Sequence, residues 1–289
     1  MNLISLDTID STNDEAKRRL RAAIAQGSGA EQELFESAIT ARKQTAGKGR
    51  RGKSFHSPDT GDSLYISFIL PPPTQHRSLE LLTVAAAVAV SLTVEEILAD
   101  SDDTEQRPSI KWVNDVMINN KKICGILAES VASDGAGTSE PTLYAIVLGI
   151  GININMREDD FPEELRGIAG SLLLDEYGHE RISEILCKNM LGIYKDMESG
   201  NAGSVLDLYR KFESTTGHKV RIMKHVMSED GKYADNRAIF AFAKAIADDG
   251  GLVVVYDDGS EEVLRSGEIS VRDCGEDSTL RSPLRGQAE

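Results

Sequence analysis

Residues 109–131 read SIKWVNDVMINNKKICGILAESV, and this stretch decides the fold class. The runs SIKW, DVMI and KKICGILAESV are short and rich in β-branched residues, and Asn119-Asn120 between the last two is typical of a two-residue hairpin turn. The next apolar run, TLYAIVLGIGINI at 142–154, predicts a buried strand that ends in glycines. A sheet is therefore expected in the middle of the chain.

Helices and further strands are predicted on both sides of this stretch. Residues 3–9 predict a short strand, and a helix is expected directly after it, because Thr12 precedes Glu15 at capping-box spacing, as Ser11 precedes Asp14. The same reasoning predicts strands at 34–42 and 63–70, a glycine-rich loop at 43–62, and helices at 78–98, 181–198 and 202–214.

The helix at 78–98 is apolar nearly all round. Its uncharged part, 81–94, is shorter than the roughly 17–25 residues that a membrane-spanning helix needs, and glutamates flank it. A buried core helix is therefore expected. The N-terminus has no signal-peptide pattern, and the three cysteines are far apart, odd in number and without CxxC spacing. Together these features predict a cytoplasmic protein without a disulfide framework.

The sequence changes character at Gly217. Short strands are predicted at 218–227, 236–247, 251–256 and 261–265, with glycine-containing turns between them. We expect a small β-barrel over residues 217–273, following a larger domain over 1–216. The polar tail, 274–289, is expected to be disordered.

One predicted loop is basic, although the chain as a whole is acidic. The chain has 289 residues and a net charge of −15, which disfavours nucleic acid and anionic membranes as partners. Yet residues 37–58 contain no acidic side chain, and interleaved glycines allow close backbone approach to an anion. This segment carries six cations: Arg42, Lys43, Lys48, Arg50, Arg51 and Lys53. It predicts an anion-binding loop.

The motif GKGRRGKS at 47–54 formally matches a P-loop and also contains G-x-G-x-x-G. Both motifs require a helix directly after the loop, and Pro58 and Gly61 prevent a helix of useful length. A P-loop nucleotidase therefore remains an alternative only, as does a module that binds nucleic acid through this loop.

Six motifs in one order carry a resemblance to a known family: STN (11–13), GKGRRG (47–52), KWVND (111–115), KKICGIL (121–127), GIGININ (149–155) and GEISVR (267–272). The chain resembles the biotin protein ligases from its start to about residue 272, in particular the monofunctional class without an N-terminal DNA-binding domain. The resemblance implies an α+β fold, with a class II synthetase-like catalytic domain around a mixed sheet and a C-terminal SH3-like barrel.

The family forms biotinyl-5'-AMP from biotin and ATP with Mg²⁺, and then transfers biotin to a lysine of a biotin carboxyl carrier protein domain, as in acetyl-CoA carboxylase. By resemblance we expect that carrier as partner and neither DNA nor membrane, and an exposed sheet edge would allow a homodimer. A lipoate-protein ligase of the same fold remains the main alternative.

The resemblance also implies the site residues, with no metal site built from protein groups. Biotin would be bound by Ser11, Thr12, Asn13, Gln44, Gly47, Lys48, Gly49, Arg50, Lys122 and Gly125. ATP would be bound by Arg50, Arg51, Phe55, Lys111, Asn114, Lys122, Asn153, Glu268 and Arg272. The catalytic residues would be Arg50, Lys122 and Asp115.

Each role has a structural alternative. Ser11 and Thr12 are also helix-capping residues, Lys122 is also a turn-flanking lysine, and Asp115 is also a turn-stabilising residue. Trp112 is expected in the core. Three positions depart from the family pattern: Val113 stands for proline, Phe55 for tryptophan and Lys48 for arginine. None is a reacting group, so we expect altered affinities and retained activity.

Overall fold

The computed structural model describes residues 1–27, 29–49, 54–58, 63–72, 76–99, 106–132, 143–174, 178–227, 233–235, 238–265 and 269–273. The chain divides into two compact units, Met1–Phe212 and Glu213–Glu289.

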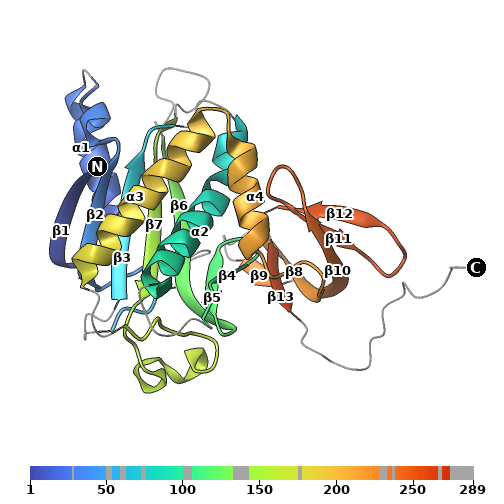
Figure 1. Cartoon of the computed structure of the whole chain (residues 1–289). Helices are drawn as coiled ribbons and strands as arrows, with labels where there is room; N and C mark the ends of the chain where they lie inside the picture. Colours follow the sequence, from blue (N-terminus) through green and yellow to red (C-terminus); the bar gives the residue numbers. More distant parts are fainter. Residues whose placement is uncertain are drawn as a thin grey trace, which may run out of the picture. The chain divides into compact units, whose positions relative to one another are not determined.

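The first unit is built on a mixed sheet (Figure 1). Its order is β1-β2-β3-β7-β6-β5-β4, in which β1 and β2 are parallel and the other neighbours are antiparallel. The strands are β1 (Asn2–Ile9), β2 (Ser37–Gln44), β3 (Ser63–Leu70), β4 (Ser109–Lys111), β5 (Asp115–Ile118), β6 (Lys121–Ala132) and β7 (Leu143–Asn153). The predicted α+β class with a mixed sheet is confirmed. Asn119 and Asn120 form the expected hairpin turn, and both have positive φ.

Strand β7 shows why the two faces of this sheet differ. Side chains alternate between faces along a strand. Ala145 and Val147 pack against Ala16 and Leu20 of helix α1 (Thr12–Gln26) in one hydrophobic cluster. Gly149 and Gly151 continue the same face, so β7 places no side chain on that face next to the start of α1.

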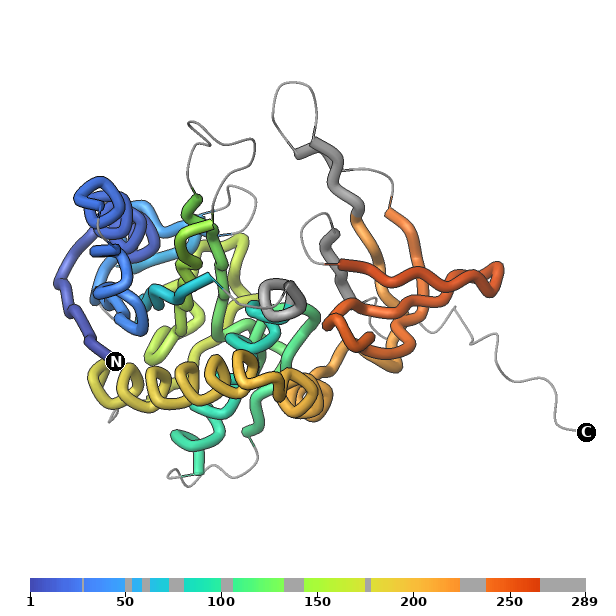
Figure 2. Tube along the Cα trace, turned by 90° about the horizontal axis from the view of Figure 1, so that it is seen from above, coloured from blue at the N-terminus to red at the C-terminus, as the bar shows by residue number. Residues whose placement is uncertain are grey.

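The opposite face is apolar along its whole length and carries the other helices. Helix α2 (His76–Ala99) packs on β4, β5 and β6, and α3 (His179–Glu198) packs on β2 and β3, with α4 (Ala202–Phe212) beside them. Figure 2 shows α1 on one side of the sheet and α3 on the other. Within α2, the stretch Leu81–Ala99 is long and apolar enough to cross a membrane by composition, but 78% of that window is buried inside the fold. It is a core helix, as predicted.

Both predicted ends of one strand were wrong. The expected strand at 34–42 begins only at Ser37, because Ala30–Leu34 forms a 3₁₀ helix whose end contributes Leu34 and Phe35 to the α1 cluster. The strand also runs on to Gln44, where a loop was predicted, because β2 pairs with the end of β1 (Ile9 opposite Gln44). This extension places Gln44 beside the start of α1.

The second unit is a small β domain, as predicted, and all the strand pairs that the structure describes in it are antiparallel. The order is β12-β11-β10-β8-β13, and β9 also pairs with β8. The strands are β8 (Lys219–Met227), β9 (Tyr233–Asp235), β10 (Ile239–Ile246), β11 (Leu252–Val255), β12 (Glu261–Leu264) and β13 (Ile269–Asp273). The predicted disordered tail, 274–289, lies outside the described residues.

Candidate functional site

The site is built on two rows of the sheet that run across β3, β7 and β6. The rows are Ser67–Gly149–Leu127 and Tyr65–Gly151–Gly125. A Cβ on Gly149 would lie 2.2 Å from Oδ1 of Asn13, and a Cβ on Gly151 or Gly125 would lie 2.8 Å from the ring of Phe55. The glycines therefore leave room for an amide on one row and an aromatic ring on the next. Gly125 was expected to leave space for biotin, whereas here the Phe55 ring lies against it.

The first row ends in a buried polar cluster where α1 begins. Thr12 donates both its backbone N–H and its hydroxyl towards Oε1 of Gln44, at 2.8 and 3.1 Å. Oγ of Ser67 lies 2.6 Å from Oδ1 of Asn13 and 2.8 Å from Oγ1 of Thr12. All four side chains are buried. The structure thus brings three of the predicted biotin residues together and adds Ser67.

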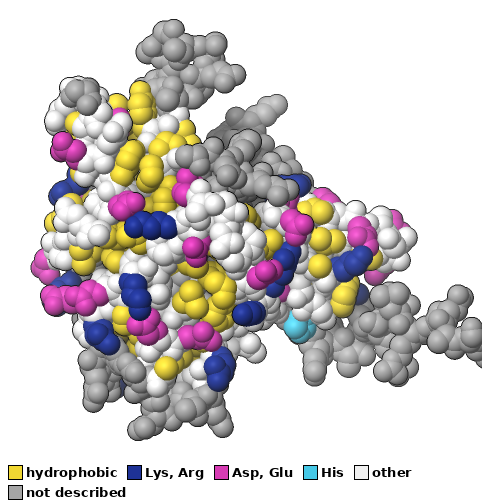
Figure 3. Space-filling view, turned by 45° about the horizontal axis from the view of Figure 1, so that its top comes forward, with side chains coloured by type: hydrophobic (Ala, Val, Ile, Leu, Met, Phe, Trp, Pro, Cys, Tyr) yellow, Lys and Arg dark blue, Asp and Glu magenta, His cyan; other side chains and the backbone are white. Residues whose placement is uncertain are grey.

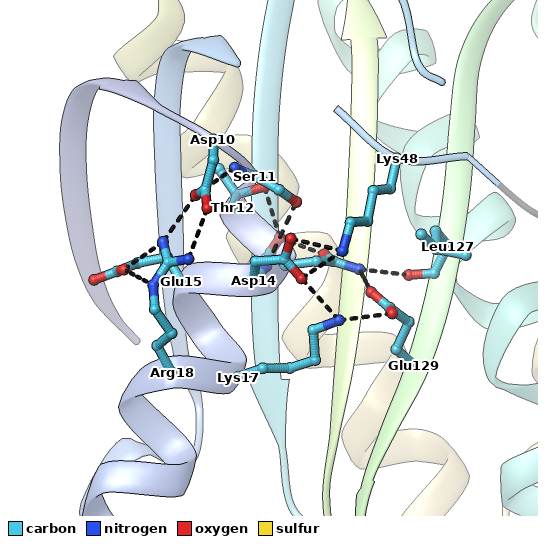
Figure 4. A network of polar contacts seen from close by, with 12 residues as sticks. Asp10, Ser11, Thr12, Asp14, Glu15, Lys17, Arg18, Lys48, Leu127 and Glu129 are labelled. Atoms are coloured by element: carbon cyan, nitrogen blue, oxygen red, sulfur yellow. Dashed lines mark hydrogen bonds and ion pairs between the residues drawn. The ribbon is translucent and has the colours of Figure 1, made fainter. Parts of the chain in front are cut away.

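Ser11 forms the N-cap of α1, as its structural alternative required. Its side-chain oxygen accepts from the backbone N–H of Asp14 at 3.4 Å. Its own backbone N–H donates to Asp10, which Arg18 holds with two hydrogen bonds of 2.7 and 2.8 Å (Figure 4). The Arg18 guanidinium lowers the pKa of Asp10 to about 2. This ion pair orients the turn that carries the polar cluster.

Asp10→Asn tests that ion pair through pH. A carboxyl with a lowered folded pKa stabilises the protein above its unfolded pKa of about 4, and this contribution disappears as pH falls through about 2. Nearly half of the Asp10 side chain and of the Arg18 side chain is exposed. We therefore expect the free energy of unfolding to fall by only about 0.5–1 kcal/mol at pH 7. Urea unfolding of both proteins between pH 7 and pH 2.5 should show this difference shrinking below pH 4. Asp7→Asn on β1 is the control, and a pH-independent difference would contradict the assignment.

The basic loop closes on itself next to this cluster. Phe55 N–H donates to Gly47 O at 2.9 Å, and Lys48 pairs with Ser54 in an antiparallel bridge. Nζ of Lys48 lies 2.7 Å from a carboxylate oxygen of Asp14 on α1. Burial raises the pKa of Asp14, but hydrogen bonds from Lys48 and Lys17 outweigh burial and hold it below its usual value.

The predicted loop cations Arg50 and Arg51 lie outside the described residues, and Gly49 stands at the edge of the described part. Residues 54–58 contain no helix, and among the described residues the next element is strand β3. The P-loop alternative required a helix directly after the loop, so it was wrong.

The second row ends in an ion pair. Nζ of Lys122 lies 2.5 Å from Oδ1 of Asp115, and each side chain is about one-third exposed. Cε of Lys122 lies 3.6 Å from the position that a Cβ on Gly125 would take, beside the Phe55 ring. The backbone of Lys122 is fixed by bonds of 2.8 Å to Ile168 O and from Gly170 N–H. A cation and a carboxylate therefore meet at the end of the site opposite the polar cluster.

Two predicted ATP residues are held by backbone carbonyls. Nδ2 of Asn114 donates to Ile126 O at 2.7 Å, and Nδ2 of Asn153 donates to Gly170 O at 2.8 Å. Both side chains are buried. Their amide nitrogens therefore fix the ends of β5 and β7, which carry Asp115 and the glycine rows.

The remaining predicted residues are only partly placed. Lys111 pairs in register with Asp115 across the β4–β5 hairpin. Trp112 is buried, as expected. Glu268 lies outside the described residues, and Arg272 lies on β13 opposite Arg221, with its side chain outside the described part.

Three polar residues near the site were missed from sequence: Ser67, Glu129 and Lys17. Oε2 of Glu129 accepts from Nδ2 of Asn13 at 2.8 Å, and its Oε1 lies 2.7 Å from Nζ of Lys17 (Figure 4). The available signal was a polar residue inside each of two buried strands. That signal could not identify Asn13 as the partner, because the contact depends on register between distant segments.

On the face in Figure 3, basic and acidic side chains are interspersed. Among the residues that the structure describes, no three His, Cys, Asp or Glu side chains are grouped as a metal site would need.

Comparisons with known proteins identify relatives of both units. Residues 9–153 match the family model described as "Biotin/lipoate A/B protein ligase family", and residues 232–272 match "Biotin protein ligase C terminal domain". The "Bifunctional ligase/repressor BirA" of Bacillus spizizenii is 38% identical over 59% of this chain and 46% of its own length. The "Biotin--[acetyl-CoA-carboxylase] ligase" of Paracoccus denitrificans is 34% identical over 50% of this chain and 51% of its own. The matched part is thus about half the length of these relatives.

A solved structure matches nearly the whole chain. The biotin protein ligase of Aquifex aeolicus in complex with biotin and ATP has a TM-score of 0.70 and 25% identity. The match covers 94% of this chain and 99% of that one.

Proposed function

The chain belongs to the biotin/lipoate A/B protein ligase family, and we propose on this basis that it is a biotin protein ligase that modifies the carrier protein of acetyl-CoA carboxylase. The observation that carries the proposal is one sheet face with a buried amide–hydroxyl cluster at one end and the Lys122–Asp115 pair at the other. The match of residues 232–272 to a biotin protein ligase domain favours biotin over lipoate.

The two ends suit the two ends of biotin. A ureido ring needs hydrogen-bond donors and acceptors, and the side chains of Thr12, Asn13 and Gln44 supply both. The biotin carboxylate then lies towards Lys122. The Phe55 ring lies along the aliphatic chain of biotin, between its ureido ring and its carboxylate. The catalytic work is to bring this carboxylate to ATP, which is also an anion.

In the first step, a carboxylate oxygen of biotin attacks the α-phosphorus of ATP, and pyrophosphate leaves with the electrons of the broken P–O bond. Lys122 leaves Asp115, contacts the biotin carboxylate and the α-phosphate of ATP, and neutralises charge that grows in the transition state. By the resemblance, Arg50 and backbone N–H groups of the glycine loop would hold further phosphate oxygens.

In the second step, the ε-amine of the carrier lysine attacks the acyl carbon of biotinyl-5'-AMP, and AMP leaves. Asp115 orients this amine and accepts its proton. The same carboxylate therefore serves as partner of Lys122 before the reaction and as base after it, which requires Lys122 to have moved to the phosphate.

Mg²⁺ would enter with the nucleotide. It binds proteins through one or two carboxylates together with substrate phosphates and water, so a dedicated cluster of protein ligands is not required. Among the described residues at the Lys122 end, Asp115 is the side chain of suitable chemistry. The metal would supply charge neutralisation at the triphosphate.

Transfer to the carrier tests the proposal as a whole. The purified protein is incubated with ATP, Mg²⁺, biotin and an acetyl-CoA carboxylase carrier domain, and the carrier is analysed by intact-mass spectrometry. We expect one biotin per carrier, and none on a carrier whose acceptor lysine is arginine. An unmodified carrier despite active adenylate formation would reject this partner.

A further inference from the structure

We infer that Glu129, together with Ser67, is a positioning residue that fixes the amide of Asn13 so that it offers only its oxygen to the substrate. This inference deepens the proposed function and rests on it, because the substrate at this end of the site is then the ureido ring of biotin. Asn13 touches the ring, and Glu129 acts through Asn13.

Both hydrogens of the Asn13 amide are directed to acceptors on β6. Nδ2 lies 2.8 Å from Oε2 of Glu129 and 3.4 Å from the backbone oxygen of Leu127. Oδ1 has no proton, so the 2.6 Å contact with Ser67 requires the serine hydroxyl to donate. Rotating the amide by half a turn would place Oδ1 against two acceptors, the carboxylate of Glu129 and the backbone oxygen of Leu127.

The orientation of Gln44 follows from the same accounting of protons. Oε1 of Gln44 faces the backbone N–H of Thr12, which can only donate, so the amide nitrogen of Gln44 must point the other way. The cluster therefore presents an acceptor at Asn13 and a donor at Gln44. A ureido group has N–H donors and a carbonyl acceptor, and it complements this pair.

Lys17 keeps the Glu129 carboxylate in place. Its Nζ lies 2.7 Å from Oε1 of Glu129 and 2.9 Å from Asp14, and its side chain is 12% exposed. Asp14 in turn contacts Lys48 of the basic loop, so Figure 4 shows one continuous chain of charges from Glu129 to the loop. The ammonium of Lys17 accepts no hydrogen bond, so it always selects an oxygen at the position that faces it.

That selection makes Glu129→Gln a sharp test. Lys17 attracts the oxygen of the new amide, which turns its NH₂ towards Nδ2 of Asn13 and places two donors face to face. Asn13 must then rotate and present a donor to biotin. We expect the Kd for biotin, measured by isothermal titration calorimetry without ATP, to rise about 10- to 100-fold. KM for biotin in pyrophosphate release should rise in parallel, whereas kcat and KM for ATP should change by about twofold or less.

A second substitution, added to the first, tests whether binding is lost because the Asn13 amide turns or because the structure is damaged. In Glu129→Gln/Lys17→Met no ammonium selects the oxygen, so the glutamine can turn it towards Asn13. We expect the Kd for biotin to recover to within about threefold of the wild-type value. If the two substitutions only damaged the structure, their effects would add and the Kd would rise further. Glu96→Gln, which changes the exposed Glu96–Lys188 pair, is the control. Ser67→Ala provides an independent test should Glu129→Gln not fold, and its Kd should rise about fivefold.

The outcomes are distinct. A wild-type protein that binds no biotin would reject the proposed function and this inference together. Biotin binding that Glu129→Gln leaves unchanged, or a double variant that binds no better than Glu129→Gln, would reject the inference alone.

Discussion

Lys122→Ala should abolish adenylate formation in a protein that still folds. The Lys122 ammonium is the described cation beside Gly125 and the Phe55 ring, and it neutralises biotin and ATP as they approach each other. Without it, the Asp115 carboxylate faces the biotin carboxylate and the α-phosphate and has lost the cation that pairs with it. We expect kcat/KM for biotin-dependent pyrophosphate release to fall by about 1,000-fold.

The fold should tolerate this change. The bonds that hold position 122 to Ile168 and Gly170 come from the backbone, and the lysine side chain is about one-third exposed. Lys121→Ala is the matched control, because the Lys121 ammonium pairs with Glu158 at an exposed position, and this substitution should leave activity unchanged. Circular dichroism and thermal unfolding check the fold, and pyrophosphate release near the wild-type rate would refute the role of Lys122.

The second large effect is expected from Gly149→Ala. The added methyl would lie 2.2 Å from Oδ1 of Asn13, and real Cβ contacts are never so short, so Asn13 must move. Its bonds to Ser67 and Glu129 are lost together. We expect the Kd for biotin to rise by about 100-fold or more and the free energy of unfolding to fall by about 1–3 kcal/mol.

Gly192→Ala in α3 is the matched control for Gly149→Ala. A Cβ at Gly192 meets no atom within 4 Å, and alanine favours a helix, so this variant should gain about 0.5–1 kcal/mol and bind biotin normally. Isothermal titration calorimetry and urea unfolding of both variants measure the two effects. Unchanged biotin affinity in Gly149→Ala would mean that Asn13 does not contact the substrate.

The elements that could be predicted from sequence are those with a local cause. The apolar runs at 63–70 and 142–154, the Asn119-Asn120 turn and the Ser11 cap each act within a few residues, and the structure has all of them. The start of β2 was mispredicted because the preceding residues form a helical turn against α1, which is a tertiary contact.

In the site, too, contacts between neighbouring segments could be predicted and contacts between distant segments could not. Asp115 and Lys122 lie seven positions apart on one hairpin, so neighbouring sequence motifs were enough to assign both residues to the site. Glu129 and Asn13 are 116 positions apart, and their contact requires the register of β6 and the placement of α1. The roles of Gly149 and Gly151 also emerged only with the structure, because a glycine in a strand does not reveal which side chain lies over it.

The most direct measurement offers the purified protein ATP and Mg²⁺ with either biotin or lipoate, and records pyrophosphate release together with the acyl-adenylate by mass spectrometry. We expect biotin-dependent pyrophosphate release and biotinyl-5'-AMP, with no product from lipoate. Lipoyl-adenylate in place of biotinyl-5'-AMP, or nucleotide hydrolysis that needs neither acid, would contradict the proposed function.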